Sequence, residues 1–226
     1  MLVEGEPAMW DNITTSIMLI FLGWLLGVLG PNITESIRNF YRIRELKDTF
    51  YIELDSLRYR LANVYFSLLL LLGRLSLEKV NWHLHIFTAY EGPDAPELPS
   101  GFSALRERLT EDNISEVNIF YRTQNEGVGK TLKRFSLPYI YSQLEFLTLL
   151  PSDYQVRILD ILAHINMFNE QVDYATVTLD RSFNSSMTVD NYHINDTNLN
   201  NAYEKIAESA RYISDKIGDL FQAHYK

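Results

Sequence analysis

Hydrophobic residues recur every three or four positions along three long segments of the chain. The first series consists of Phe50, Leu54, Leu57, Leu61, Val64, Leu68, Leu71 and Leu75. The second is Ile158, Ile161, Ile165, Phe168, Val172, Ala175 and Leu179, and the third is Leu199, Tyr203, Ile206, Ala210, Ile213, Ile217 and Leu220. This spacing places an apolar seam on one side of an α-helix. The three seams therefore predict long helices that bury these side chains against one another.

Shorter elements are predicted between the long helices. A further helical period passes through Leu137, Ile140, Leu144 and Leu147, and Pro151-Ser152-Asp153 is typical of one helix ending and the next being capped. Residues 102–109 predict a short helix. Residues 79–87 fit both a strand and a helix, and the lack of a partner strand favours the helix. Residues 91–101, with three prolines and two glycines, and the polar residues 184–198 predict loops.

The most hydrophobic part of the chain lies near its N-terminus. Residues 12–34 contain no charged side chain, and residues 13–30 approach the ~20 apolar residues that cross a hydrocarbon core. The acidic N-terminus and the missing small-x-small cleavage site favour an uncleaved anchor over a signal peptide. Gly30-Pro31 predicts the end of this helix. The uncharged residues 61–73 are too few for a second span and predict a core helix.

Basic residues follow this segment and none precede it. Arg38, Arg42, Arg44 and Lys47 are the first bases of the chain. Because cytoplasmic flanks of membrane helices are enriched in Lys and Arg, the N-terminal tail is expected outside and the remainder in the cytoplasm. The same four residues are candidates for contact with anionic lipid headgroups.

These patterns predict an all-α fold with one N-terminal transmembrane helix followed by an antiparallel helical bundle. The expected parts are a tail at 1–12, a transmembrane helix at 13–30, a juxtamembrane stalk at 31–49 and a cytoplasmic bundle at 50–226. Within the span, Gly23 and Gly27 form a GxxxG pair, which lets two helix backbones approach closely. A homodimer through this face is therefore one expectation.

Composition narrows the possible functions. The 226-residue chain has a net charge of −9 and no cysteine. A mildly acidic domain argues against a general DNA-binding protein, which needs bases for the phosphates. The lack of cysteine excludes disulfides and thiolate metal sites.

Few residues suggest bound cofactors or metals. Gly129-Lys130-Thr131 matches the end of a phosphate-binding P-loop, but the glycine required earlier is replaced by Gln124. A turn between helices is the better interpretation. His83 and His85 would share a face only on a strand. No cofactor and no metal is predicted.

Arg157 and His164 are separated by six residues on a predicted helix. This spacing resembles the Arg-x4–6-His motif of HEPN ribonucleases, which are all-helical. Over the eight residues that it covers, the resemblance implies that His164 is the acid/base group and Arg157 the phosphate ligand, in a site shared by two protomers. Ile158 departs from the family pattern, which usually has a polar residue after the arginine.

Two functional hypotheses follow. The first is a membrane-anchored interaction or signalling module without catalytic residues, with membrane lipid and an unidentified protein as partners. The second is a membrane-anchored effector enzyme, a HEPN-like ribonuclease that uses Arg157 and His164.

Overall fold

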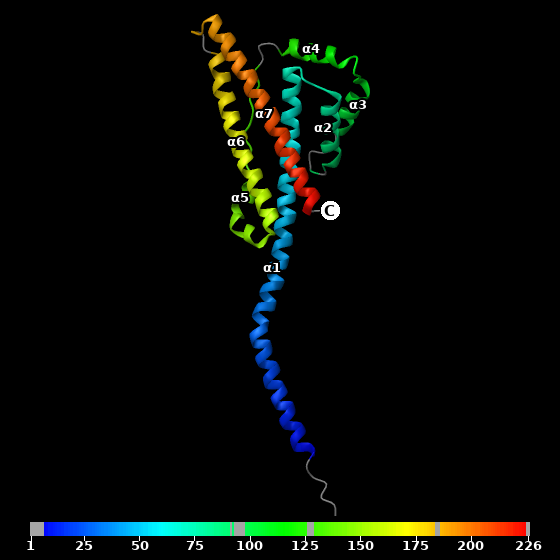
Figure 1. Ribbon diagram of the computed structural model, residues 1–226, viewed down its shortest axis with the longest axis vertical. Coiled ribbons are helices and arrows are strands. Elements are labelled where there is room, and N and C mark those ends of the chain that lie inside the picture. Colours follow the sequence, from blue (N-terminus) through cyan, green and yellow to red (C-terminus); the bar gives the residue numbers. More distant parts are fainter. Residues whose placement is uncertain (1–6, 91, 93–97, 126–128, 184–185, 225–226) are drawn as a thin grey trace, which may run out of the picture. The chain divides into compact units, whose positions relative to one another are not determined.

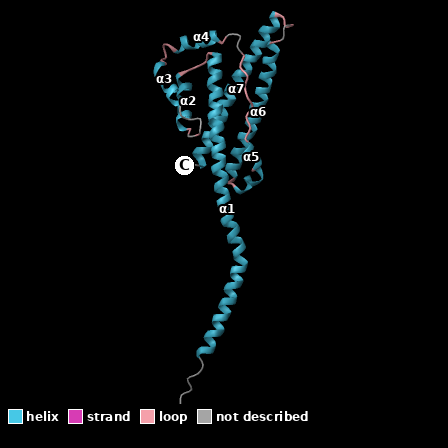
Figure 2. Ribbon diagram, turned by 180° about the vertical axis from the view of Figure 1, so that it is seen from behind, coloured by secondary structure: helices cyan, strands magenta, loops and turns pink. Residues whose placement is uncertain are grey.

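The computed structural model describes residues 7–90, 92, 98–125, 129–183 and 186–224 (Figure 1). In chain order the elements are α1 (Pro7–Leu72), α2 (Leu77–Ala89), α3 (Leu98–Arg108), α4 (Ile114–Gln124), α5 (Pro138–Ser142), the 3-10 helix η1 (Leu144–Leu149), α6 (Ser152–Ser182) and α7 (Val189–His224). Within these described ranges there is no strand (Figure 2). The predicted all-α class is confirmed.

The chain divides into two compact units, residues 1–47 and 48–226, and α1 contributes to both. The first unit contains the apolar segment. Among the described residues one helix, α1 from Thr14 onward, is long and apolar enough to cross a membrane. Its most apolar stretch has a mean hydropathy of 1.9 and is 0% buried. The prediction of one such helix near the N-terminus is confirmed by length and composition.

The predicted helix end at Gly30-Pro31 is wrong. Pro31 lies inside α1, which continues without interruption to Leu72. Proline lacks a backbone N–H, so Pro31 leaves the carbonyl of Gly27, four residues earlier, without its helical donor, and a long helix tolerates this single loss. The Thr34 hydroxyl donates to a different carbonyl, that of Gly30, at 2.9 Å. The chain after the apolar segment is therefore helical.

The core of residues 48–226 is built from the predicted seams. Every seam residue of α6 and α7 is buried, and in α1 only Val64 and Leu71 are half-buried. The helices α6 and α7 pack side by side (Figures 1 and 2). The Asn195 amide donates to the Thr178 carbonyl at 2.9 Å, and His224 Nε2 lies 3.1 Å from Asp153 Oδ2. The last turn of α7 therefore meets the first turn of α6.

Two predicted loops are partly helical. The helix α7 begins at Val189, inside the predicted loop 184–198, because Asn195 is buried and hydrogen bonded to α6. The helix α3 begins at Leu98, inside the predicted loop 91–101, and Pro99 is permitted there because the first helical turn needs no N–H bond. Positions 91, 93–97 and 184–185 lie outside the described residues.

The smaller elements are largely as predicted. The helix α2 covers 79–87, and the Ser76 hydroxyl caps it by accepting from the Lys79 N–H at 3.3 Å. The helix α6 begins at Ser152, one residue earlier than a Ser152 cap would allow, and it has no side-chain cap because the N-cap residue is Pro151, whose side chain has no hydrogen-bond acceptor. Residues 137–147 form α5 and η1 rather than one helix, separated at Gln143.

Candidate functional site

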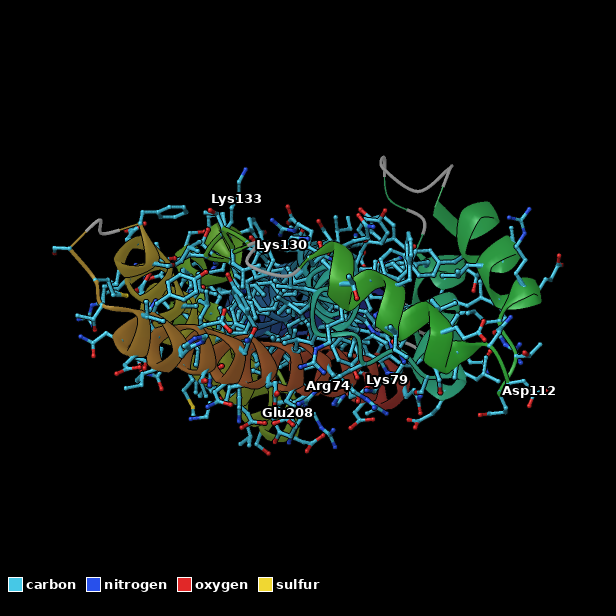
Figure 3. All side chains as sticks on the ribbon, turned by 90° about the horizontal axis from the view of Figure 1, so that it is seen from above. Arg74, Lys79, Asp112, Lys130, Lys133 and Glu208 are labelled. Carbon is cyan, nitrogen blue, oxygen red and sulfur yellow. The ribbon has the colours of Figure 1, made fainter. Side chains whose placement is uncertain are left out.

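Three helices surround a cavity that is lined by charged side chains. The cavity has a volume of about 400 Å³ and lies between the end of α1, the start of α2 and the middle of α7. Its charged lining residues are Arg74, Lys79, Glu204, Glu208, Arg211 and Asp215. Figure 3 labels Arg74 and Lys79, which lie close to α7, and Glu208, which belongs to α7. The cavity thus combines three bases with three acids.

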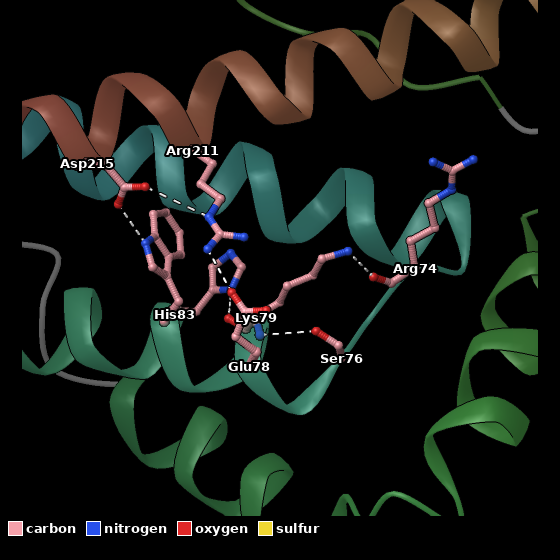
Figure 4. A network of polar contacts seen from close by, with 8 residues as sticks. Arg74, Ser76, Glu78, Lys79, His83, Arg211 and Asp215 are labelled. Carbon is pink, nitrogen blue, oxygen red and sulfur yellow. Dashed lines mark hydrogen bonds and ion pairs between the residues drawn. The ribbon is translucent and has the colours of Figure 1, made fainter.

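An ion-pair network joins α2 to α7 beside this cavity (Figure 4). Arg211 Nη2 lies 2.8 Å from Glu78 Oε1, and Arg211 Nε lies 3.8 Å from Asp215 Oδ2. Trp82 Nε1 donates to Asp215 Oδ1 at 2.8 Å, and the Arg211 guanidinium lies 6.0 Å from the Trp82 ring centroid. We call Glu78, Trp82, Arg211 and Asp215 the α2–α7 clasp.

The bases of the cavity are already engaged. Arg74 forms an ion pair with Glu204, and Lys79 Nζ donates to the Arg74 carbonyl at 2.8 Å. Burial, with Arg211 and Arg74 nearby, lowers the pKa of Lys79, whereas the hydrogen bond to Glu78 raises the pKa of Arg211. Each guanidinium of the cavity has a carboxylate partner. The charged residues of the cavity therefore serve to hold the helices together.

His83 lies behind the clasp in an aromatic cluster. It is 0% exposed, and its ring centroid is 5.1 Å from that of Tyr65 and 5.3 Å from that of Phe66. Nδ1–H donates to the Lys79 carbonyl at 2.6 Å, whereas the buried Nε2 has no hydrogen-bond partner among the described residues. Burial lowers the pKa of His83 to about 4, so the ring is neutral near pH 7. His85 is exposed, so the two histidines do not share a face.

Arg157 and His164 engage two different carboxylates of α6. Arg157 Nε lies 3.0 Å from Asp153 Oδ2, which also contacts His224. His164 Nδ1 lies 3.3 Å from Asp160 Oδ1 and 2.8 Å from the Asp160 carbonyl, and the His164 ring centroid is 4.8 Å from that of Tyr212. The two side chains are therefore held by separate partners, and no described contact joins them.

The Gly129-Lys130-Thr131 segment is held by packing and by one buried tyrosine. The Tyr203 hydroxyl accepts from the Lys130 N–H at 2.7 Å and donates to the Lys130 carbonyl at 2.9 Å. A Cβ at Gly129 would lie 1.9 Å from Leu179 Cδ1. The preceding residues 117–121 are helical, and 126–128 lie outside the described residues. Close packing thus accounts for this glycine.

The residues singled out in the N-terminal unit lie along α1. A Cβ added at Gly23 or Gly27 would meet nothing within 4 Å. Arg38 and Arg44 are exposed, and Arg42 and Lys47 are half-buried. The glycine face is therefore uncovered in the single chain.

An apolar surface that the seam analysis missed runs along α6. Val156, Leu159, Met167, Tyr174 and Val177 are 65%, 52%, 53%, 55% and 51% exposed. We call these five residues the α6 outer row. They recur at helical spacing on the side away from the buried seam, so the sequence contained a second, interleaved period on this helix.

No group of three or more His, Asp or Glu side chains in the described part of the chain is placed to hold a metal ion. Comparison with protein-family models, with curated proteins and with solved structures found no match to this chain.

Proposed function

We propose that the protein is a membrane-anchored interaction or signalling module: one N-terminal transmembrane helix followed by a cytoplasmic, antiparallel helical bundle. Its partners in this proposal are membrane lipid and a protein that docks on the bundle. A homodimer through the Gly23 and Gly27 face is compatible with it. No DNA partner is proposed for an acidic chain.

The exposed apolar segment of α1 is the observation that carries the proposal. Ile17, Met18, Leu19, Ile20 and Phe21 are each at least 60% exposed, and large apolar side chains remain exposed as far as Leu29. Apolar surface that stays in water costs ~25 cal/mol of free energy per Å² relative to buried surface. An exposed apolar surface of this extent is therefore unfavourable in water. A lipid bilayer removes that cost, because α-helices satisfy their backbone hydrogen bonds internally.

The orientation in the proposal rests on charge. The bases Arg38, Arg42, Arg44 and Lys47 follow the apolar segment and none precede it. Each base near an anionic leaflet contributes ~1 kcal/mol of attraction. The cytoplasmic leaflet is the anionic one, so this charge supports a cytoplasmic domain.

The engaged polar groups of the domain favour binding over catalysis. The guanidinium groups of Arg74, Arg157 and Arg211 are all held by carboxylates. The α6 outer row, in contrast, offers apolar area that no described residue covers. A module of this kind acts through its surface.

Alkaline carbonate extraction of membranes tests the anchoring. We expect the wild-type chain to stay in the membrane pellet and Leu22→Arg/Leu26→Arg to be released, because each arginine at the centre of a span costs ~2.5–3.5 kcal/mol. Ile119→Arg/Phe120→Arg, which changes two exposed residues of α4, is the matched control and should stay in the pellet. Release of the wild-type chain would refute the proposal.

A further inference from the structure

The α6 outer row is accompanied by a hollow in the surface. The hollow has a volume of about 460 Å³ and is lined by Met167, Glu170, Gln171 and Tyr174 of α6, with Asn198, Asn201, Ala202 and Lys205 of α7. Two members of the row, Met167 and Tyr174, therefore flank a depression. A helix laid along α6 would find apolar contacts at both ends and a polar recess between them.

The recess contains an unused hydrogen-bond acceptor. Gln171 Oε1 is buried and has no hydrogen-bond partner among the described residues. A buried polar atom without a partner costs ~1–3 kcal/mol. A donor from an occupant would remove this cost, so the recess selects a side chain with N–H groups.

Charge identifies the kind of donor. The helix α6 carries five acids and two arginines. Glu170 lies in the middle of the row, is exposed, and has no ion pair among the described residues. Lys205 is the single base among the residues that line the hollow. An occupant with a basic side chain opposite Glu170 and Gln171 would satisfy both groups.

A second copy of the chain fits this surface poorly. Its own α6 would bring the same excess of acids against the first. In a pairing with identical residues opposite each other, Glu170 would face Glu170 and Lys205, the single base of the hollow, would face Lys205. Like charges placed together in an interface are unfavourable.

We infer that the α6 outer row and its hollow bind an amphipathic helix of another protein, with apolar residues on one side and a basic residue, best an arginine, between them. The apolar residues cover Met167 and Tyr174, and the arginine donates to Gln171 Oε1 and pairs with Glu170. This inference rests on the proposed role as an interaction module and names the chemistry of its partner.

Peptide binding to the full chain in nanodiscs of zwitterionic phosphatidylcholine tests the inference. The probe is an 18-residue amphipathic helix with leucines on one side and one arginine at its centre, and a second peptide carries glutamate there. Empty nanodiscs give the lipid background. We expect saturable binding of the arginine peptide, and binding at least fivefold weaker for the glutamate peptide.

Variants locate the binding. Met167→Glu and Tyr174→Glu should each weaken binding of the arginine peptide at least tenfold, and the control Ile119→Glu, at an equally exposed residue of α4, should leave it unchanged. Gln171→Met removes the acceptor and should weaken binding severalfold without lowering the melting temperature. A purely structural role of Gln171 would not give this result.

Three outcomes would overturn the inference. They are no binding above the empty nanodiscs, equal binding to all variants, and a disulfide dimer of Met167→Cys in membranes. Because the chain has no cysteine of its own, such a dimer would make a second copy the occupant. Carbonate extraction of the same membranes reports anchoring separately, so failure here does not mean failure of the anchor.

Discussion

At the scale of single residues, buried polar groups in the 48–226 unit are placed by specific partners. Asn169 accepts from the Phe135 N–H at 2.8 Å and donates to the Phe135 carbonyl at 2.7 Å. Tyr203 pairs in the same way with both backbone groups of Lys130. His83 differs, because its buried Nε2 has no hydrogen-bond partner among the described residues. Burial disfavours the charged form of the ring and lowers its pKa, which makes the stability of the fold dependent on pH.

We expect the free energy of unfolding to fall as the pH is lowered from 7 to 4.5, with His83 supplying ~2–3 kcal/mol of the loss. The pKa of His83 is about 4 in the fold, against ~6.5 for an unfolded histidine. Below pH 6.5 the unfolded chain therefore binds a proton that the folded chain does not. Urea unfolding followed by circular dichroism at both pH values measures the difference.

Paired variants isolate the histidine from other titrating groups. His83→Phe should lose most of this pH dependence, whereas His85→Phe, at an exposed position of the same helix, should keep it. If both variants retain the wild-type dependence, then the environment of His83 is not as described.

At the scale of elements, the clasp joins α2 to α7, whereas the buried residues of α2 pack on α1 and α3. We expect Trp82→Phe to lower the free energy of unfolding by ~0.5–1.5 kcal/mol, because the indole N–H bond to Asp215 is lost while the ring remains. Asp215→Ala in the Trp82→Phe background should then cost less than Asp215→Ala alone. Equal costs in both backgrounds would show that the two residues act independently.

The glycine face of α1 gives a prediction for the membrane segment. A Cβ at Gly23 or Gly27 meets nothing within the chain, so larger side chains there leave the single helix intact and change only contacts with another helix. We expect chemical crosslinking in native membranes to give a wild-type dimer that Gly23→Ile/Gly27→Ile abolishes. The control Leu22→Ile/Leu26→Ile should still form the dimer. A monomeric wild-type chain would leave the segment as an anchor alone.

The long helices could be predicted from the sequence, because a seam such as Ile158 to Leu179 repeats without interruption. The helix over 189–198 could not be predicted, because its residues are polar. Its position depends on a long-range hydrogen bond from Asn195 to α6. The continuation of α1 through Pro31 could not be predicted either, because local rules end a helix at proline, whereas here the loss of one backbone hydrogen bond does not interrupt the helix.

The candidate sites were harder to predict than the helices. Trp82 and Asp215 are 133 residues apart and meet only through packing of α2 on α7, and no local pattern indicates such a pair. Arg157 and His164 lie on one helix as expected, but their partners Asp153 and Asp160 depend on side-chain geometry. The α6 outer row was visible as a second apolar period and was overlooked beside the stronger buried seam.

At the scale of the whole molecule, we propose separate tasks for the two units. In this proposal the exposed apolar residues of the N-terminal unit make a membrane anchor, and the charges that follow set its direction. The unit from residue 48 buries its seams and, in the same proposal, offers the α6 outer row for docking. Both tasks require that the two ends of the chain lie on opposite sides of a membrane, and this is the central claim.

Single-cysteine labelling in spheroplasts tests this claim most directly, because the chain has no cysteine to interfere. A membrane-impermeant maleimide should label Val3→Cys in intact spheroplasts, and should label Asp112→Cys, at an exposed residue, only after lysis. Labelling of Asp112→Cys in intact spheroplasts with Val3→Cys protected would reverse the orientation. Labelling of both before lysis would contradict a single crossing of the membrane.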